Sequence, residues 1–127
     1  MILHAGDVSA DAADLSYIFP HIPTRYVCGN CEYSSVSPDL EIEADGKKIF
    51  LTHGHFYNVK NEISCTTLIN RARGIGADIA VFGHTHNPLC TNLGDLIILN
   101  PGSAKYGKTY GVIEIENGRI GACVLDM

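Results

Sequence analysis

Residues 78–86 read Asp78-Ile79-Ala80-Val81-Phe82-Gly83-His84-Thr85-His86, a short apolar run that ends in a glycine and two histidines. The run has the length and composition of a buried β-strand. The glycine allows the backbone to turn sharply where the strand ends. Imidazole is a common ligand of transition metals. This stretch therefore predicts a buried strand whose carboxyl end presents potential metal ligands, and it sets the pattern for the rest of the chain.

The same pattern occurs after three other apolar runs, at residues 1–4, 25–28 and 48–52. They are followed by Gly6-Asp7, by Gly29-Asn30-Cys31-Glu32 and by His53-Gly54-His55. In α/β sheets the carboxyl ends of the strands form the ligand crevice, so side chains from separate strands can converge there. We expect one cluster with the members Asp7, Asn30, His53, His84 and His86.

Each member of this cluster also has a structural interpretation. Asp7 could cap the following helix, Asn30 could occupy a turn, and the two histidines after Gly83 could be polar residues at a strand end. The joint occurrence at four strand ends favours a metal site. A set of one carboxylate, one amide oxygen and several imidazoles suits Mn, Fe, Co, Ni or Zn better than Ca or Mg, with Mn as first choice. Two such ions would attract a phosphate ester and lower the pKa of bound water, which predicts metal-assisted hydrolysis.

The remaining pattern mixes helices with hairpins. Helices are expected at about 10–19, capped by Ser9 and stopped by Pro20, and at about 59–73, capped by Asn58 and followed by Gly74. Asp-Gly and Asn-Gly pairs within residues 44–47 and 116–119 predict tight hairpins, and a looser turn at 92–95 precedes an apolar run at 96–99. The expected fold class is α/β, with two packed sheets.

Composition limits the partners and the compartment. The 127 residues form one expected domain, 1–127, with a formal net charge of −5. The longest cluster of basic residues is Lys47-Lys48, so a long nucleic acid is not expected as a partner, whereas a small phosphate ester is. No membrane-length apolar run and no signal peptide are visible, so we expect a cytoplasmic protein without a membrane partner. The five cysteines lack a regular spacing, and the Cys28/Cys31 pair lacks the context of a zinc or redox motif.

The order of these motifs, completed by Asn100-Pro101-Gly102-Ser103, resembles the small YfcE-like phosphodiesterase branch of the calcineurin-like metallophosphoesterases. The resemblance implies a two-sheet sandwich flanked by helices and a metal-dependent phosphodiesterase activity, in which a metal-bridging hydroxide attacks phosphorus. It further implies that Asp7 bridges two metals, that Asn30, His53 and His84 complete one site, and that His86 belongs to the other.

Two departures from the family pattern shape the expectations. The family's first motif, Asp-x-His, is absent, so we expect a domain that lacks the first strand and helix, or a protein that starts further upstream. One metal site would then be well occupied and the other weak, which would impair activity. Cys31 stands where larger relatives have a histidine that protonates the leaving group. The incomplete sheet predicts self-association, at least as a dimer. The alternative function is a non-catalytic interaction scaffold with a vestigial metal site, like the retromer subunit of the same fold.

Overall fold

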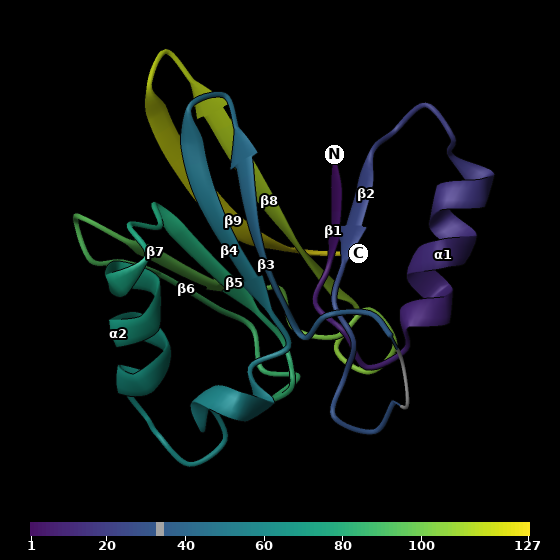
Figure 1. The fold of residues 1–127 in the computed structure, drawn as a ribbon, viewed down its shortest axis with the longest axis horizontal. Coiled ribbons are helices and arrows are strands. Elements are labelled where there is room, and N and C mark those ends of the chain that lie inside the picture. The colour runs from purple at the N-terminus through teal and green to yellow at the C-terminus, as the bar shows by residue number, and fades with distance from the viewer. Residues whose placement is uncertain (33–34) are drawn as a thin grey trace.

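A five-stranded sheet forms the centre of the molecule (Figure 1). Its strand order is β3-β4-β5-β7-β6, with β4, β5 and β7 parallel and the two edge strands antiparallel to their neighbours. The computed structural model describes residues 1–32 and 35–127. The elements in chain order are β1 (Ile2–His4), α1 (Ser9–Ile18), β2 (Thr24–Tyr26), β3 (Asp39–Ala44), β4 (Lys47–Thr52), the 3-10 turn η1 (His55–Tyr57), α2 (Thr66–Gly74), β5 (Ile79–Phe82), β6 (Leu89–Asn92), β7 (Ile97–Asn100), β8 (Thr109–Glu116) and β9 (Arg119–Asp126).

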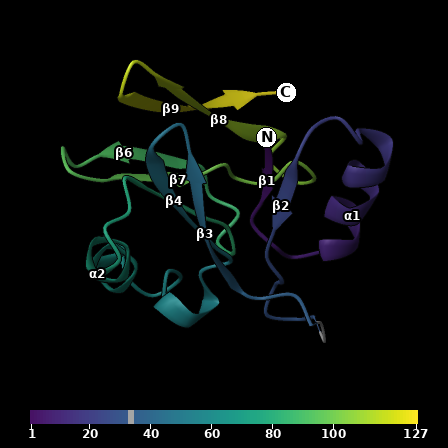
Figure 2. The same cartoon turned by 45° about the horizontal axis from the view of Figure 1, so that its top comes forward.

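Both faces of the central sheet are covered, which explains why its parallel strands read as continuous apolar runs. On one face, Phe50 and Ala80 pack against Leu68 of α2. On the other face, Leu51 and Val81 belong to a second core that the β8–β9 hairpin covers. Figure 2 shows α2 and the hairpin on opposite sides of the sheet. The predicted α/β fold, with sheets packed face to face and flanked by helices, is confirmed.

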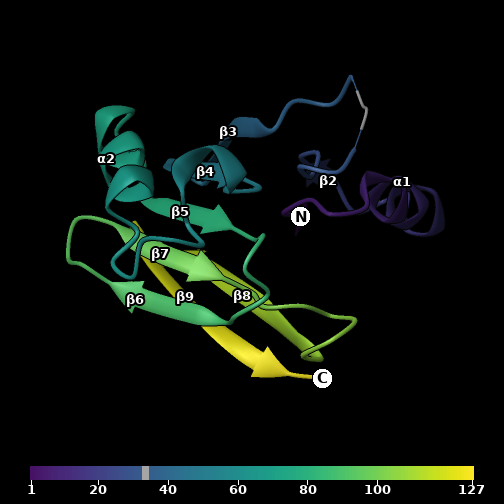
Figure 3. The ribbon, with the colours of Figure 1, turned by 90° about the horizontal axis from the view of Figure 1, so that it is seen from below.

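β1 and β2 form a separate parallel pair next to this assembly. Leu3 and Ala5 pack against the second core, and Val27, just after β2, is fully buried in it. Helix α1 packs against β2 and lies on the far side of the pair from the central sheet (Figures 1 and 3). This arrangement directs the carboxyl end of β1 toward the ends of β4 and β5.

The two hairpin turns form as predicted. Asp45 and Gly46 have φ values of 49° and 79°, and Asn117 and Gly118 have 52° and 74°. Positive φ at both central residues is the requirement of a type I′ turn, which asparagine, aspartate and glycine meet at least cost. These turns set the antiparallel register of β3 with β4 and of β8 with β9.

The predicted helix caps are wrong. The residue before α1 is Val8, and the Ser9 hydroxyl and amide donate to Glu32 instead of closing the helix start. The second helix begins at Thr66 rather than 59, because Cys65 adopts a left-handed conformation with φ 53°. The Glu62 carboxylate accepts the amide of Thr67, a role that the sequence analysis assigned to Asn58.

The carboxyl end of this second helix also differs from the expectation. Gly74 is its last residue, and the left-handed residue that follows the helix is Gly76, with φ 72°. In the described part of the chain, no helix is both long and apolar enough to cross a membrane.

Candidate metal centre

The five side chains selected from the sequence meet at the carboxyl ends of β1, β2, β4 and β5. His53 is the centre of the group: its Nε2 atom lies 3.2 Å from Asn30 Oδ1, 3.1 Å from His84 Nδ1 and 3.5 Å from Asp7 Oδ1. His86 joins through Asp7, with 2.6 Å between its Nε2 atom and Asp7 Oδ2. Residues up to 79 positions apart in the chain therefore form one contiguous polar cluster.

The environment of His53 fixes which ring nitrogen faces the cluster. The ring is completely buried, and its Nδ1 atom lies 2.8 Å from the carbonyl oxygen of Ala5. A carbonyl accepts only, so Nδ1 carries the proton and Nε2 presents a lone pair. A histidine held in this way by a backbone carbonyl is the usual arrangement of a metal ligand. His53 is thus prepared to donate its Nε2 lone pair to a cation.

Asp7 lies between two groups of potential ligands. One carboxylate oxygen faces His53, and the other faces His86. The side chains of Asp7 and His86 are 48% and 38% exposed, in contrast to the buried His53. The cluster therefore has a closed inner side and an open outer side from which a ligand can approach.

Two glycines make this close approach of strand ends possible. A Cβ atom on Gly6 would lie 2.5 Å from His53 Nδ1, and Gly6 has φ 99°. A Cβ atom on Gly29 would lie 2.7 Å from the backbone nitrogen of Asp7. Any larger residue would push apart the loops that carry Asp7, Asn30 and His53.

Three members of the cluster have strained backbones. Asp7, His84 and His86 have φ values of 72°, 65° and 60°. A left-handed conformation costs a non-glycine residue about 1–3 kcal/mol and is retained mainly where function or surrounding structure requires it. The three residues with this strained backbone are all predicted metal ligands.

Asn100 holds the loop that carries the last two histidines. Its buried Nδ2 group donates to the carbonyl of Gly83 and to the hydroxyl of Thr85, each at 3.0 Å. Its Oδ1 atom accepts the amide of Gly102 at 2.9 Å. The Asn-Pro-Gly-Ser segment thus acts as a support for the Gly-His-Thr-His loop.

The electrostatic environment keeps His84 neutral. Burial first, and then the nearby Lys60, His53 and His55, lower its pKa to about 4, against a smaller opposite effect of Asp7. A neutral imidazole is the form that binds metals. His55 lies close by, with ring centroids 5.2 Å from His53, and its buried Nδ1 atom has no hydrogen-bond partner among the described residues.

Sequence reasoning missed three contributors to this region. These are the Ala5 carbonyl, Lys60, and Tyr106, whose ring stacks on His86 with centroids 5.6 Å apart. Of these, only Tyr106 had a sequence signal, its position three residues after Ser103 of the Asn-Pro-Gly-Ser motif. Lys105 lies over the Tyr106 ring, 5.2 Å from its centroid, which places it near the cluster.

The donor atoms contact one another rather than surround a common point. Within residues 1–32 and 35–127, no group of three or more His, Cys, Asp or Glu side chains is arranged as a metal-binding group. The donor set nevertheless has the right chemistry, two or three imidazoles with a carboxylate and an amide oxygen. Ligands bonded to one ion at about 2.1 Å lie about 3 Å apart, which is close to the distances from His53 Nε2.

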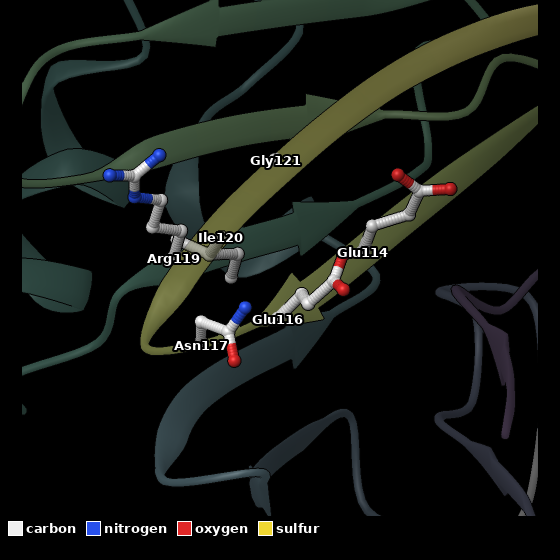
Figure 4. A pocket seen from close by; sticks show the side chains of 6 residues that line it. All are labelled: Glu114, Glu116, Asn117, Arg119, Ile120 and Gly121. Carbon is white, nitrogen blue, oxygen red and sulfur yellow. The ribbon is translucent and has the colours of Figure 1, made fainter.

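One surface cavity lies away from this cluster. It has a volume of about 590 Å³ and lies at the tip of the β8–β9 hairpin, where Glu114 and Glu116 come from one strand and Arg119 from the other (Figure 4). Another cavity, of about 490 Å³, is lined in part by Thr85, which lies between the two histidines of the loop.

Fold and cluster together define an α/β protein with nitrogen and oxygen ligands gathered at the strand ends of its sheets. Residues 1–118 match the family model of the calcineurin-like phosphoesterase superfamily domain, and the chain belongs to this family. The resemblance stated from the sequence is confirmed.

Two relatives show how much of the family the chain spans. The probable metallophosphoesterase YsnB of Bacillus subtilis (strain 168) is 32% identical, over 92% of this chain and 69% of YsnB. The phosphodiesterase YfcE of Escherichia coli (strain K12) is 28% identical, over 69% of this chain and 50% of YfcE. The chain thus spans about half the length of YfcE.

Solved structures agree with the fold. A conserved predicted phosphoesterase from Streptococcus pneumoniae TIGR4 superposes with a TM-score of 0.77 at 26% identity, over 98% of this chain and 72% of its own. Vps29 from Entamoeba histolytica, solved in complex with Zn²⁺, gives 0.75 at 22% identity, over 98% of this chain and 80% of its own. At that identity Vps29 indicates the shared fold alone.

Proposed function

We propose that this chain is a metal-dependent phosphodiesterase. The observation that carries the proposal is the buried His53, whose Nδ1–H donates a hydrogen bond to the Ala5 carbonyl while Nε2 faces Asn30, His84 and Asp7. In the Nδ1–H tautomer, His53 Nε2 and Asn30 Oδ1 are both acceptors. Their 3.2 Å contact becomes favourable when a cation lies between them or when the amide turns its NH₂ group inward. Membership of the phosphoesterase family supports a cation between these two atoms.

The residues would divide between two ions. Asn30, His53 and His84 with one oxygen of Asp7 would hold the first, and His86 with the other oxygen of Asp7 would belong to the second. Two protein ligands are few, so we propose that the second ion binds more weakly than the first. Mn²⁺ is the proposed ion, with Fe, Co, Ni or Zn as candidates of similar ligand preference.

A bound divalent ion supplies positive charge for a phosphate ester and lowers the pKa of its bound water to about 7. The chain itself contributes orientation. The Ala5 carbonyl holds the His53 ring, Asn100 holds the loop of His84 and His86, and the Tyr106 ring limits rotation of His86. The exposed carboxylate of Asp7 leaves the outer side of the cluster open to a small phosphate ester, the proposed substrate class.

Hydrolysis of bis-p-nitrophenyl phosphate with added Mn²⁺ tests this proposal. We expect turnover by the wild-type chain, its loss after chelation by EDTA, and at least about a hundredfold lower kcat/KM in His84→Ala. His21→Ala is the matched control, because His21 is an exposed loop histidine. Absence of turnover with every divalent ion would contradict the proposal.

The alternative is a scaffold with a vestigial site, which the fold shared with Vps29 suggests. A scaffold does not require the strained backbones of Asp7, His84 and His86 or the orientation of His53. If His53→Ala and His84→Ala changed neither hydrolysis nor cation binding, the scaffold would be the better account.

A further inference from the structure

A cavity of about 490 Å³ is lined in part by Thr85, the residue between His84 and His86 of the candidate metal centre. Its lining comes from two segments, residues 59–65 and residues 82–89, and Thr85 belongs both to this wall and to the loop between His84 and His86. Cavities of this size are typical of small-molecule sites. The hairpin cavity in Figure 4 is larger but has no contact with the cluster.

The segment that forms the outer wall is held in place without being helical. Asn58 and Cys65, at its two ends, have φ values of 55° and 53°. Between them, the Glu62 carboxylate accepts the amide and the hydroxyl of Thr67 at 2.8 and 2.6 Å. These bonds connect the wall to the first turn of α2.

The inner wall is fixed as well. The Thr85 hydroxyl accepts from Asn100 Nδ2 at 3.0 Å and from the amide of Asn87 at 3.2 Å. The Phe82 side chain, 2% exposed, lies behind it in the first core. A group bound in the cavity would therefore sit at a defined position relative to His84 and His86.

The lining combines apolar surface with one cation and one carboxylate, that of Glu62, which accepts two hydrogen bonds from Thr67. Val59, Phe82, Pro88 and Leu89 provide apolar surface, and Ile63 stands at the rim with its side chain fully exposed, at 104%. Lys60 lines the same cavity. An exposed isoleucine beside a lysine, next to a cluster suited to phosphate, matches an anion that carries an apolar or aromatic substituent.

We propose that this cavity binds the apolar or aromatic arm of a phosphate diester while the phosphate lies at the candidate metal centre, with Lys60 adding positive charge between the two. The inference rests on the proposed function and specifies its substrate class: diesters with a bulky apolar arm are preferred over those with small alkyl arms. Ile63 and Leu89 are the specificity-determining residues, and neither belongs to the catalytic cluster.

Equilibrium binding tests the inference independently of turnover. Diphenyl phosphate and diethyl phosphate carry the same anion and differ in their arms, and each is titrated calorimetrically into the wild-type chain with Mn²⁺ present. We expect diphenyl phosphate to bind about tenfold more tightly, the effect of burying one additional aromatic ring. Ile63→Ser should weaken diphenyl phosphate about fivefold and leave diethyl phosphate unchanged, whereas Lys60→Ala should weaken both.

Matched controls are available elsewhere in the chain. Ile18→Ser removes a 61% exposed isoleucine from α1, and Lys47→Ala removes a lysine at the end of β4 remote from the cluster. Neither should alter the affinity of either diester.

Equal wild-type affinities for the two diesters, or a preference that Ile63→Ser leaves intact, would overturn the inference. Hydrolysis of both diesters at one rate with equal affinity would leave the proposed function standing and remove only the cavity's role. Selective binding of diphenyl phosphate without turnover would support the role of the cavity and contradict the proposed function.

Discussion

The Nδ1 atom of His53 lies 2.8 Å from the carbonyl oxygen of Ala5, and this contact orients the centre of the cluster. Because the carbonyl can only accept, the ring proton is on Nδ1, and the Nε2 lone pair points toward Asn30, His84 and Asp7. Long-range ¹H–¹⁵N NMR spectra of the imidazoles should show His53 as the Nδ1–H tautomer. Added Zn²⁺ should shift Nε2 and leave Nδ1 protonated. Observation of the Nε2–H tautomer in the metal-free chain would contradict the assignment.

Gly6→Ala should damage both stability and the cluster. The new Cβ atom would lie 2.5 Å from His53 Nδ1, at a backbone position with φ 99°. We expect a loss of about 1–3 kcal/mol in the free energy of unfolding, together with weaker cation binding. Urea denaturation provides the measurement. Gly74→Ala is the control, because nothing lies within 4 Å of its added Cβ atom; it should stabilise the chain by up to about 1 kcal/mol.

Asn100→Ala should release the loop that carries His84 and His86. The substitution removes three hydrogen bonds and leaves the buried carbonyl of Gly83 without this donor. The expected cost is about 2–3 kcal/mol in unfolding free energy, with faster amide exchange at Thr85. Asn70→Ala, on the exposed face of α2, should change neither property. Unchanged amide exchange in Asn100→Ala would show that the loop is held by other contacts.

Tyr106 should act on the cluster through its ring alone. It stacks on His86 at a centroid distance of 5.6 Å and an interplanar angle of 25°. Tyr106→Phe keeps the ring and should retain Mn²⁺ affinity, whereas Tyr106→Ala should lower it about three- to tenfold. Tyr17→Ala, at an 88% exposed position on α1, serves as control. A loss of Mn²⁺ affinity in Tyr106→Phe as large as that in Tyr106→Ala would point to the hydroxyl instead.

The sequence was most informative where the physics is local. Apolar runs followed by glycine and a polar side chain predicted the strands and the convergence of their ends, since parallel strands bring their carboxyl ends to one edge. Asp45-Gly46 and Asn117-Gly118 predicted their turns because the required φ values belong to the residue types themselves.

The errors and omissions involve contacts between residues distant in the chain. Ser9 is recruited by Glu32, 23 positions away, so the expected local cap does not form. The Glu62 carboxylate accepts the amide of Thr67 at the start of the second helix. Residues 59–65, where this helix was expected to begin, line the cavity instead. The Ala5–His53 contact spans 48 positions and has no local signature. The expected dimer stays a prediction, which light scattering can check.

Calorimetric titration with Mn²⁺ measures whether one cation site is shared by Asp7, Asn30, His53, His84 and His86. The wild-type chain should bind Mn²⁺ saturably, with one tight site and one weaker site. Asn30→Ala, at an exposed position that leaves the core intact, should weaken the tight site at least about tenfold. No saturable binding by the wild type, or equal binding by wild type and Asn30→Ala, would contradict a shared cation site at these residues.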